Sequence, residues 1–154
     1  MRWEEGRTLV EELIEHDELE RVTADRNSAK ELLKAAGRHL SSAGAIRDTD
    51  PEGAYSMAYD AARKACAALL EAQGLRATSN GGHVAVKGAI MAQFSNLSGG
   101  AVVKSFDRLR RRRNDIEYPD GDSRIDPDEV DEAIARSGAI VDFADRLVNE
   151  LPVF

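Results

Sequence analysis

Apolar residues recur along most of this chain at alternating steps of four and three positions. One such series is Ala29, Leu33, Ala36, Leu40 and Ala43. This spacing keeps the side chains on one face of an α-helix. It predicts helices over about 7–20, 24–44, 51–73, 82–95, 100–118 and 127–148, and no strand-like alternation competes with them. We therefore expect an all-α fold, an antiparallel up-and-down bundle of about four core helices with short additional helices.

Two of these helices carry clear terminal signals. Asp50 precedes Pro51, and Asp126 precedes Pro127. Aspartate is a favoured N-cap residue, and proline fits the first helical position because its missing N–H has no helical partner there. Glu129 is also spaced for a capping box with Asp126. Gly74 can adopt the left-handed backbone conformation that often ends a helix.

Composition narrows the class of protein. The 154 residues are 42% hydrophobic and 32% charged, which suits one globular domain over 1–154, with 1–22 as an N-terminal helical extension. The single cysteine, Cys66, lies in an apolar series, which predicts a buried packing role and a reducing compartment. No run approaches the roughly 18 apolar residues of a membrane span. We expect a cytoplasmic protein without membrane contact.

Charge is unevenly distributed along the chain. The net charge of −7 argues against general nucleic-acid binding, and residues 1–25 and 126–150 are strongly acidic. Between them, however, five of the six residues 108–113 are arginine. Such a local basic patch can concentrate an anionic ligand, or the acidic helices of the same protein can cover it.

One of these arginines interrupts an apolar series. The helical spacing gives Val102, Phe106, Leu109, Arg113 and Ile116, which puts a guanidinium where an apolar side chain belongs. A charge facing a bundle interior is costly unless it meets a carboxylate, a phosphate or a wet groove. Two interpretations stay open: a structural ion pair with Glu117, four residues on, or a phosphate-binding role in a cleft.

The segment around Arg113-Asn114 resembles the motif of the HEPN-domain proteins, which include HepT-like toxins and abortive-infection ribonucleases. That motif is an arginine, usually followed by a polar residue, and a histidine after four to six more residues. The third helix, GAYSMAYDAARKACAALLEAQGL, and the following GGHVAV also resemble the family. The resemblance implies metal-independent RNA cleavage without a cofactor, in a homodimer paired through the motif helices, with an antitoxin protein as a further partner. The arginine would hold the scissile phosphate and the histidine would transfer a proton. The flanking arginines would contact RNA: Arg108, Arg110, Arg111 and Arg112.

This chain departs from the motif at its second half. Tyr118 occupies the position of the histidine at the shortest spacing, and no histidine follows it. A tyrosine ordinarily titrates near pH 10 and is a poor base at neutral pH. Asp115, Glu117 and His83 are candidate supporting groups, although we expect His83 to have a structural role at the start of its helix.

Three functions follow from these residues. The first is a ribonuclease that uses Arg113, Asn114 and Tyr118. The second is a non-catalytic module that binds RNA, nucleotide or a protein partner through the same groove. The third is a helical scaffold in which the arginines only pair with acidic helices. We expect no metal site, because no cluster of cysteine and histidine with ligand spacing occurs.

Overall fold

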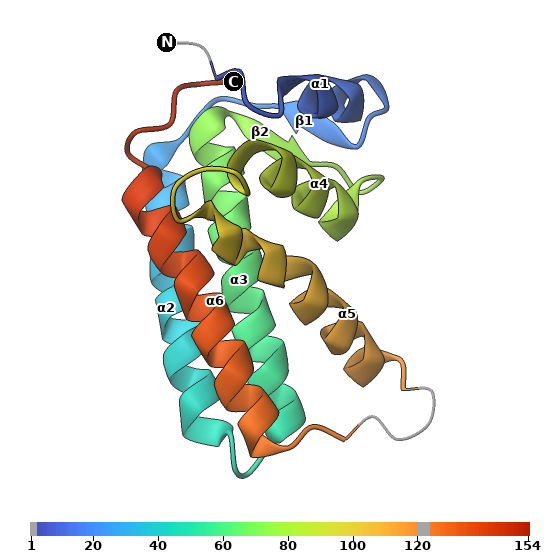
Figure 1. Ribbon diagram of the computed structural model, residues 1–154, viewed down its shortest axis with the longest axis vertical. Helices are drawn as coiled ribbons and strands as arrows, with labels where there is room; N and C mark the ends of the chain where they lie inside the picture. Colours follow the sequence, from blue (N-terminus) through green and yellow to red (C-terminus); the bar gives the residue numbers. More distant parts are fainter. Residues whose placement is uncertain (1–2, 120–123) are drawn as a thin grey trace.

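The computed structural model describes residues 3–119 and 124–154, and helices dominate it (Figure 1). In chain order its elements are α1 (Arg7–Glu15), β1 (Leu19–Arg21), α2 (Arg26–Ile46), α3 (Pro51–Gln73), β2 (Leu75–Ala77), α4 (Gly82–Phe94), the short 3₁₀ helix η1 (Gly100–Lys104), α5 (Ser105–Glu117) and α6 (Pro127–Leu147).

Three long helices, α2, α3 and α6, lie side by side and form the body of the bundle (Figure 1). The central helix is α3, whose buried positions are mostly alanine: Ala54, Ala58, Ala61, Ala62, Ala65 and Ala68 are all 0% exposed. Small side chains let neighbouring helices approach closely, and alanine also has the highest helix propensity. The predicted all-α bundle is confirmed. The small α1 and α4 pack together at one end, and α5 leans away from α3 toward its own C-terminal end (Figure 1).

The caps predicted at Asp50, Asp126 and Gly74 are confirmed, whereas the Glu129 side chain, which is spaced for a capping box, binds Arg112 instead. The Asp50 side chain accepts a hydrogen bond from the Gly53 backbone N–H at 3.0 Å, and Asp126 accepts one from that of Glu129 at 3.0 Å. Gly74 ends α3 in the left-handed conformation, with φ of 75°. These caps satisfy backbone groups that have no partner within the helix.

The expectation of a helix through residue 20, with no strand in the chain, was wrong. The first helix ends at Glu15, and Asp17 takes a φ of 56°, which a continuing helix does not allow. β1 then pairs antiparallel with β2, with Leu19 opposite Ala77. The N-terminal extension is therefore part helix and part strand. Strands of three residues are too short to show an alternating pattern, and the partner lies far away in the sequence.

The helix expected over 100–118 also begins differently. Its first turn is the 3₁₀ helix η1, after which α5 continues as an α-helix. As a result Val103, rather than Val102, is fully buried, together with Phe106 and Leu109 at 1% exposure. Steps of three suit 3₁₀ geometry, which has three residues per turn. Among the described residues, no helix is long and apolar enough to cross a membrane.

Candidate functional site

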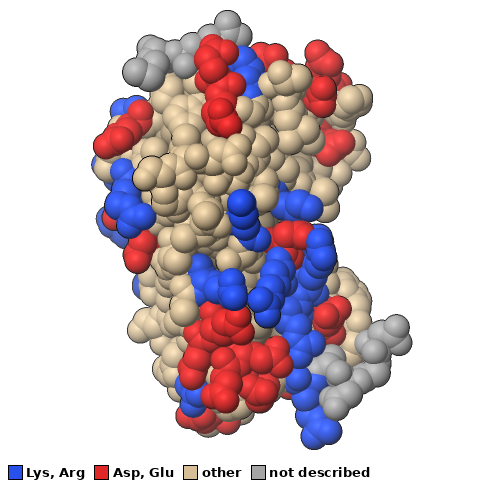
Figure 2. Space-filling model, viewed as in Figure 1, with Lys and Arg blue, Asp and Glu red and all other residues tan. Residues whose placement is uncertain are grey.

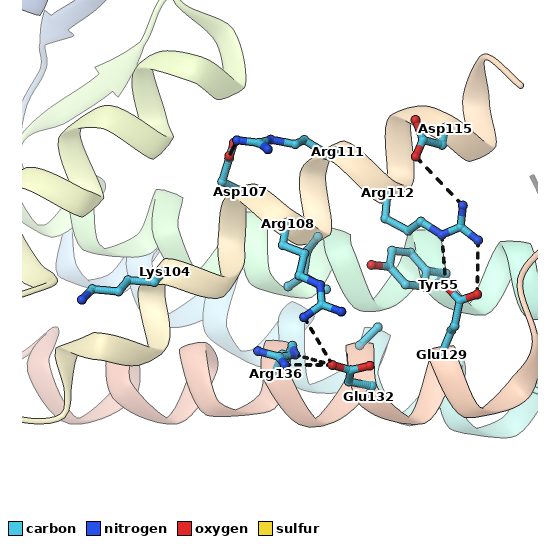
Figure 3. Close-up of a pocket in the computed structure, with 12 residues that line it drawn as sticks. Tyr55, Lys104, Asp107, Arg108, Arg111, Arg112, Asp115, Glu129, Glu132 and Arg136 are labelled. Atoms are coloured by element: carbon cyan, nitrogen blue, oxygen red, sulfur yellow. Dashed lines mark hydrogen bonds and ion pairs between the residues drawn. The ribbon is translucent and has the colours of Figure 1, made fainter. Parts of the chain in front are cut away.

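Two hollows flank α5, one on each side. The first, between α5 and α6, has a volume of about 640 Å³ and is lined mainly by charged side chains (Figure 3). The second, of about 470 Å³, lies among α3, α4 and α5 and includes Arg113. Both volumes fall within the range typical of ligand sites. Volume therefore does not show which hollow is the candidate site, and the side chains that line each one have to be compared.

Ion pairs across the α5–α6 hollow engage several of its arginines (Figure 3). Arg112 Nε lies 3.0 Å from Glu129 Oε2. Arg108 and Arg136 both meet Glu132, at 3.7 and 2.8 Å. Figure 2 shows the same mixture, with basic side chains along α5 beside acidic ones on α6. The acidic helix thus offsets much of the positive charge on this side.

Two more arginines of α5 pair within their own helix. Arg110 Nη2 lies 2.9 Å from Asp107 Oδ1, and Arg111 Nη2 lies 2.5 Å from Asp107 Oδ2. Burial acts to raise the pKa of Asp107, but the Arg110 hydrogen bond and the nearby charges of Lys87 and Arg111 hold that pKa below its ordinary value. Asp115 lies 4.0 Å from Arg112, three positions earlier in the same helix.

The second hollow gathers a different set of groups, and we call it the arginine–histidine cavity. Four positions on one face of α3 contribute to it, spaced by three and four residues: Ser56, Tyr59, Asp60 and Arg63. The remaining wall consists of His39 from α2, Met57 from α3, His83 from the first turn of α4 and Arg113 from α5. It thus combines two guanidinium groups, two imidazoles and a carboxylate.

Arg113 borders this cavity at 31% side-chain exposure. Its Nη2 lies 3.1 Å from Glu117 Oε1, so the ion pair expected from the i, i+4 spacing is present. Its Cζ also lies 5.9 Å from the centre of the Tyr59 ring, within the range of a cation–π contact. A guanidinium has five N–H donors, and one carboxylate leaves donors over for an anion.

His83 is held by Tyr59. The Tyr59 hydroxyl lies 2.6 Å from His83 Nδ1. The Tyr59 side chain is only 2% exposed, and its ring stacks on Phe106 of α5 with centroids 5.8 Å apart. Burial raises the pKa of Tyr59 to about 12, which keeps the hydroxyl protonated at neutral pH. The hydroxyl can donate to Nδ1 or accept from it, so it fixes the imidazole in either tautomer.

Asp60 connects the other polar groups of the cavity. It accepts hydrogen bonds from Lys64 at 2.6 Å and Arg63 at 2.8 Å, and its Oδ2 lies 3.3 Å from His39 Nε2. Burial acts to raise the pKa of Asp60, but the Lys64 and Arg63 hydrogen bonds outweigh it and lower that pKa. The carboxylate therefore stays ionised at neutral pH and partly balances Arg63.

The charges around His83 favour its neutral form. Burial first, and then the positive charges of Arg63, Arg113 and Arg110, lower the pKa of His83 below its ordinary value of 6.5, with Asp60 opposing. As the pH falls, the unfolded chain takes up the proton near pH 6.5, before the folded protein does. The neutral histidine therefore contributes stability above pH 6.5, and this contribution is lost as the pH falls through the lower pKa of the folded state.

We expect an NMR titration of the His83 ring to give a pKa below 6.5. The Arg63→Gln substitution should raise this pKa, because among the three arginines Arg63 lowers it most, and glutamine keeps a polar side chain without the charge. An exposed substitution of equal charge, Arg38→Gln on α2, should leave the His83 titration unchanged. A His83 pKa at or above 6.5 would contradict the burial and charge described here.

A comparison with protein families matches the HEPN domain over residues 27–147. The chain belongs to the HEPN family. A comparison with curated proteins and another with solved structures gave no match. The HEPN match spans α2 to α6 and every residue of the arginine–histidine cavity, whereas α1 and β1 precede it. The resemblance read from the sequence, and the helical bundle that it implied, are confirmed.

The structure separates the motif residues of this HEPN chain. Arg113 borders the arginine–histidine cavity, but Asn114 and Tyr118 are not part of its wall. Tyr118 follows the last residue of α5 and is 78% exposed, with its backbone N–H bonded to the Asn114 carbonyl at 2.9 Å. Glu117 and Asp115 face Arg113 and Arg112 instead. Of the candidate supporting groups, only His83 joins the cavity.

Sequence reasoning missed three groups of this cavity: His39, Asp60 and Arg63. The signal that could have found two of them is the polar series Ser56, Asp60 and Arg63 on one face of an otherwise alanine-rich helix. Within residues 3–119 and 124–154, no three histidine, cysteine or carboxylate side chains are grouped so that they could hold a metal ion. The polar groups that line the cavity are guanidinium, imidazole and hydroxyl groups and the Asp60 carboxylate.

Proposed function

We propose that this HEPN protein is a metal-independent endoribonuclease that acts at the arginine–histidine cavity. In this reaction the ribose 2′-oxygen attacks the adjacent phosphorus, and the 5′-oxygen of the next nucleotide leaves. The observation that supports the proposal is the meeting of Arg113 and Arg63 with His83 and His39 around one cavity. Guanidinium groups bind phosphate through paired N–H donors, and imidazole transfers protons near neutral pH.

Local charge at the cavity supports an anionic ligand, although the chain as a whole is acidic. Asp60 is the one carboxylate in its wall, against two arginines, so the wall is positive by one charge even with both histidines neutral. The α5–α6 hollow has the same excess of one positive charge, with five basic residues against four carboxylates, but no histidine is among the residues that line it. We therefore place the phosphate on the α3–α4 side of α5.

A second candidate function is binding without cleavage. It is favoured by Tyr118, which stands where the family motif has histidine and lies outside the cavity. In that function the same groove would hold RNA, a nucleotide or an acidic segment of a partner protein. Affinity would then depend strongly on salt, because phosphate contacts release counterions.

The homodimer and the antitoxin partner stay proposals that rest on family membership. A second chain would approach the end of α5, where Tyr118 is 78% exposed. Light scattering would show whether two chains associate. A toxin or defence role would require that expression of the protein arrests growth and that a partner protein relieves the arrest.

Incubating the protein with labelled RNA in EDTA tests the proposed function. We expect cleavage without divalent metal, with 2′,3′-cyclic phosphate ends on the upstream fragments. The same sequence with 2′-O-methyl groups should stay intact, because the attacking hydroxyl is blocked, but should compete for binding. Salt-sensitive binding of RNA that remains intact would favour the second candidate, and no binding would contradict both.

A further inference from the structure

The end of α5 leaves the proposed reaction without a group to accept a proton. Tyr118 is exposed and Glu117 pairs with Arg113, while Asp115 lies on the side of Arg112. None of these three side chains contributes to the arginine–histidine cavity. If RNA is cleaved there, the proton acceptor has to come from another helix.

His83 has the geometry that such a group requires. It stands in the first turn of α4, directly after Gly81 and Gly82, and borders the same cavity as Arg113. Its Nδ1 lies 2.6 Å from the Tyr59 hydroxyl, and in the tautomer in which Nδ1–H donates to that oxygen, Nε2 carries the free lone pair. Tyr59 is itself fixed by burial and by stacking on Phe106. The imidazole is thus oriented before any substrate binds.

His39 is the alternative imidazole of the cavity, but its surroundings differ. Its Nε2 lies 3.3 Å from Asp60 Oδ2, and that carboxylate already accepts hydrogen bonds from Arg63 and Lys64. A carboxylate only accepts hydrogen bonds, so Nε2 of His39 faces Asp60 as an N–H donor and has no free lone pair there to take a proton. His83 has no carboxylate among its hydrogen-bond partners in the described part of the chain.

We propose that His83 accepts the proton from the ribose 2′-hydroxyl and that Tyr59 positions its ring, so that the imidazole comes from α4 instead of α5. This inference rests on the proposed function. The bond from O2′ to phosphorus forms as the 2′-hydroxyl proton passes to His83 Nε2. The bond from phosphorus to O5′ breaks, and O5′ leaves with the electron pair and takes a proton from solvent. The products are a 2′,3′-cyclic phosphate and a 5′-hydroxyl.

The surroundings of His83 agree with this role. The titratable and charged groups that face it are His39 of α2, Tyr59, Asp60 and Arg63 of α3, and Arg110 and Arg113 of α5. Burial and the three arginines lower its pKa, so the ring is neutral at pH 7 and ready to accept a proton. Substrate phosphate would offset those positive charges and raise the proton affinity of the ring as the reaction proceeds.

The decisive experiment compares His83→Asn with the wild-type protein. The asparagine amide can replace Nδ1 as the partner of the Tyr59 hydroxyl, but it cannot accept a proton as Nε2 does. We expect RNA cleavage in EDTA to fall by about 100-fold or more, with RNA affinity unchanged. The acidic limb of the pH profile of kcat/KM should disappear. His16→Asn, at the exposed end of α1, is the matched control and should cleave like wild type.

Two further variants separate chemistry from structure. Added imidazole should restore part of the cleavage by His83→Ala, which a purely structural histidine would not allow. Tyr59→Phe keeps the ring that stacks on Phe106 but removes the hydroxyl. Losing one such orienting hydrogen bond should lower kcat about tenfold with KM unchanged and shift the apparent pKa of the acidic limb.

The outcomes separate the two proposals. Wild-type protein that leaves RNA intact in EDTA rejects the ribonuclease function and His83 as its base together. If wild type cleaves RNA and His83→Asn cleaves it equally well, only the role of His83 is rejected. The same holds if the acidic limb of the pH profile persists in this variant. If His83→Asn does not fold, as circular dichroism would show, imidazole rescue of His83→Ala decides: rescue supports the role and its absence overturns it.

Discussion

Replacing Arg113 with alanine should lower RNA cleavage by about 100- to 1,000-fold, the usual cost of removing one group that stabilises charge in a transition state. In the proposed reaction negative charge grows on the phosphate oxygens, and Arg113 is the one guanidinium of the cavity that comes from α5. Arg63 remains in the variant, but it comes from α3 and is held beside Asp60, 2.7 Å away. We therefore do not expect it to take the position that Arg113 occupies on α5.

The fold should tolerate this substitution. The pair that Arg113 forms with Glu117 is partly exposed, at 31% and 44%, and pairs of that kind contribute about 0–1 kcal/mol. Thermal unfolding of Arg113→Ala should therefore stay close to that of wild type. Arg113→Lys keeps the charge but loses the planar fork, and we expect an intermediate loss of activity.

A charge-matched control distinguishes a specific site from general attraction of RNA. Arg76 of β2 is 62% exposed and pairs with Glu20, away from both hollows. Arg76→Ala changes the net charge by the same amount and should leave cleavage unchanged. Equal losses for Arg113→Ala and Arg76→Ala would show that net charge, rather than the cavity, governs the activity.

Replacing Gln93 with leucine should lower the free energy of unfolding by about 1–3 kcal/mol, because it strands a buried amide. Gln73, the last residue of α3, and Gln93 of α4 are both 0% exposed. Each side-chain Nε2 donates to the other Oε1, at 2.7 and 3.1 Å. Leucine is close in size, so the loss comes from the unpaired N–H and carbonyl of Gln73 rather than from an empty space. Urea denaturation would measure it.

The double variant Gln73→Leu/Gln93→Leu provides the internal control. Removing both amides leaves no stranded polar side chain, so this variant should be more stable than Gln93→Leu alone. The two substitutions should be coupled by about 0.5–3 kcal/mol in a double-mutant cycle. Additive losses would mean that the amide pair does not hold α4 against α3.

Features that depend on neighbouring residues were predictable from the sequence. The caps at Asp50, Gly74 and Asp126 involve only groups a few positions away, so their residue types alone indicate them. The strands were not predictable, because Leu19 pairs with Ala77 across two intervening helices. Likewise, the regular helical spacing does not reveal that residues 100–104 form the 3₁₀ helix η1, in which Val103 is buried.

The candidate site divides in the same way. Arg113 was predictable because it interrupts an apolar series within its own helix. Asp60 and Arg63 are visible in the sequence only as part of a polar series on α3, and their place in a cavity with Arg113 depends on how α5 packs beside α3. His83 was visible as a histidine at a helix start, but its role depends on Tyr59, which lies 24 residues away in the chain. Local sequence shows which groups exist, and the packing of helices determines which of them meet.

The attachment of α5 has a mechanical consequence. Phe106 and Leu109 anchor its first half in the core, whereas from Arg110 to Tyr118 no residue is fully buried. Lighter contacts hold its second half: Ile116 packs against the core at partial burial, and Arg112 pairs with Glu129 of α6. The span between Arg113 and the imidazole of His83 therefore depends on these two contacts. A ligand that displaced Arg112 from Glu129 would change this span and leave the core of the bundle in place.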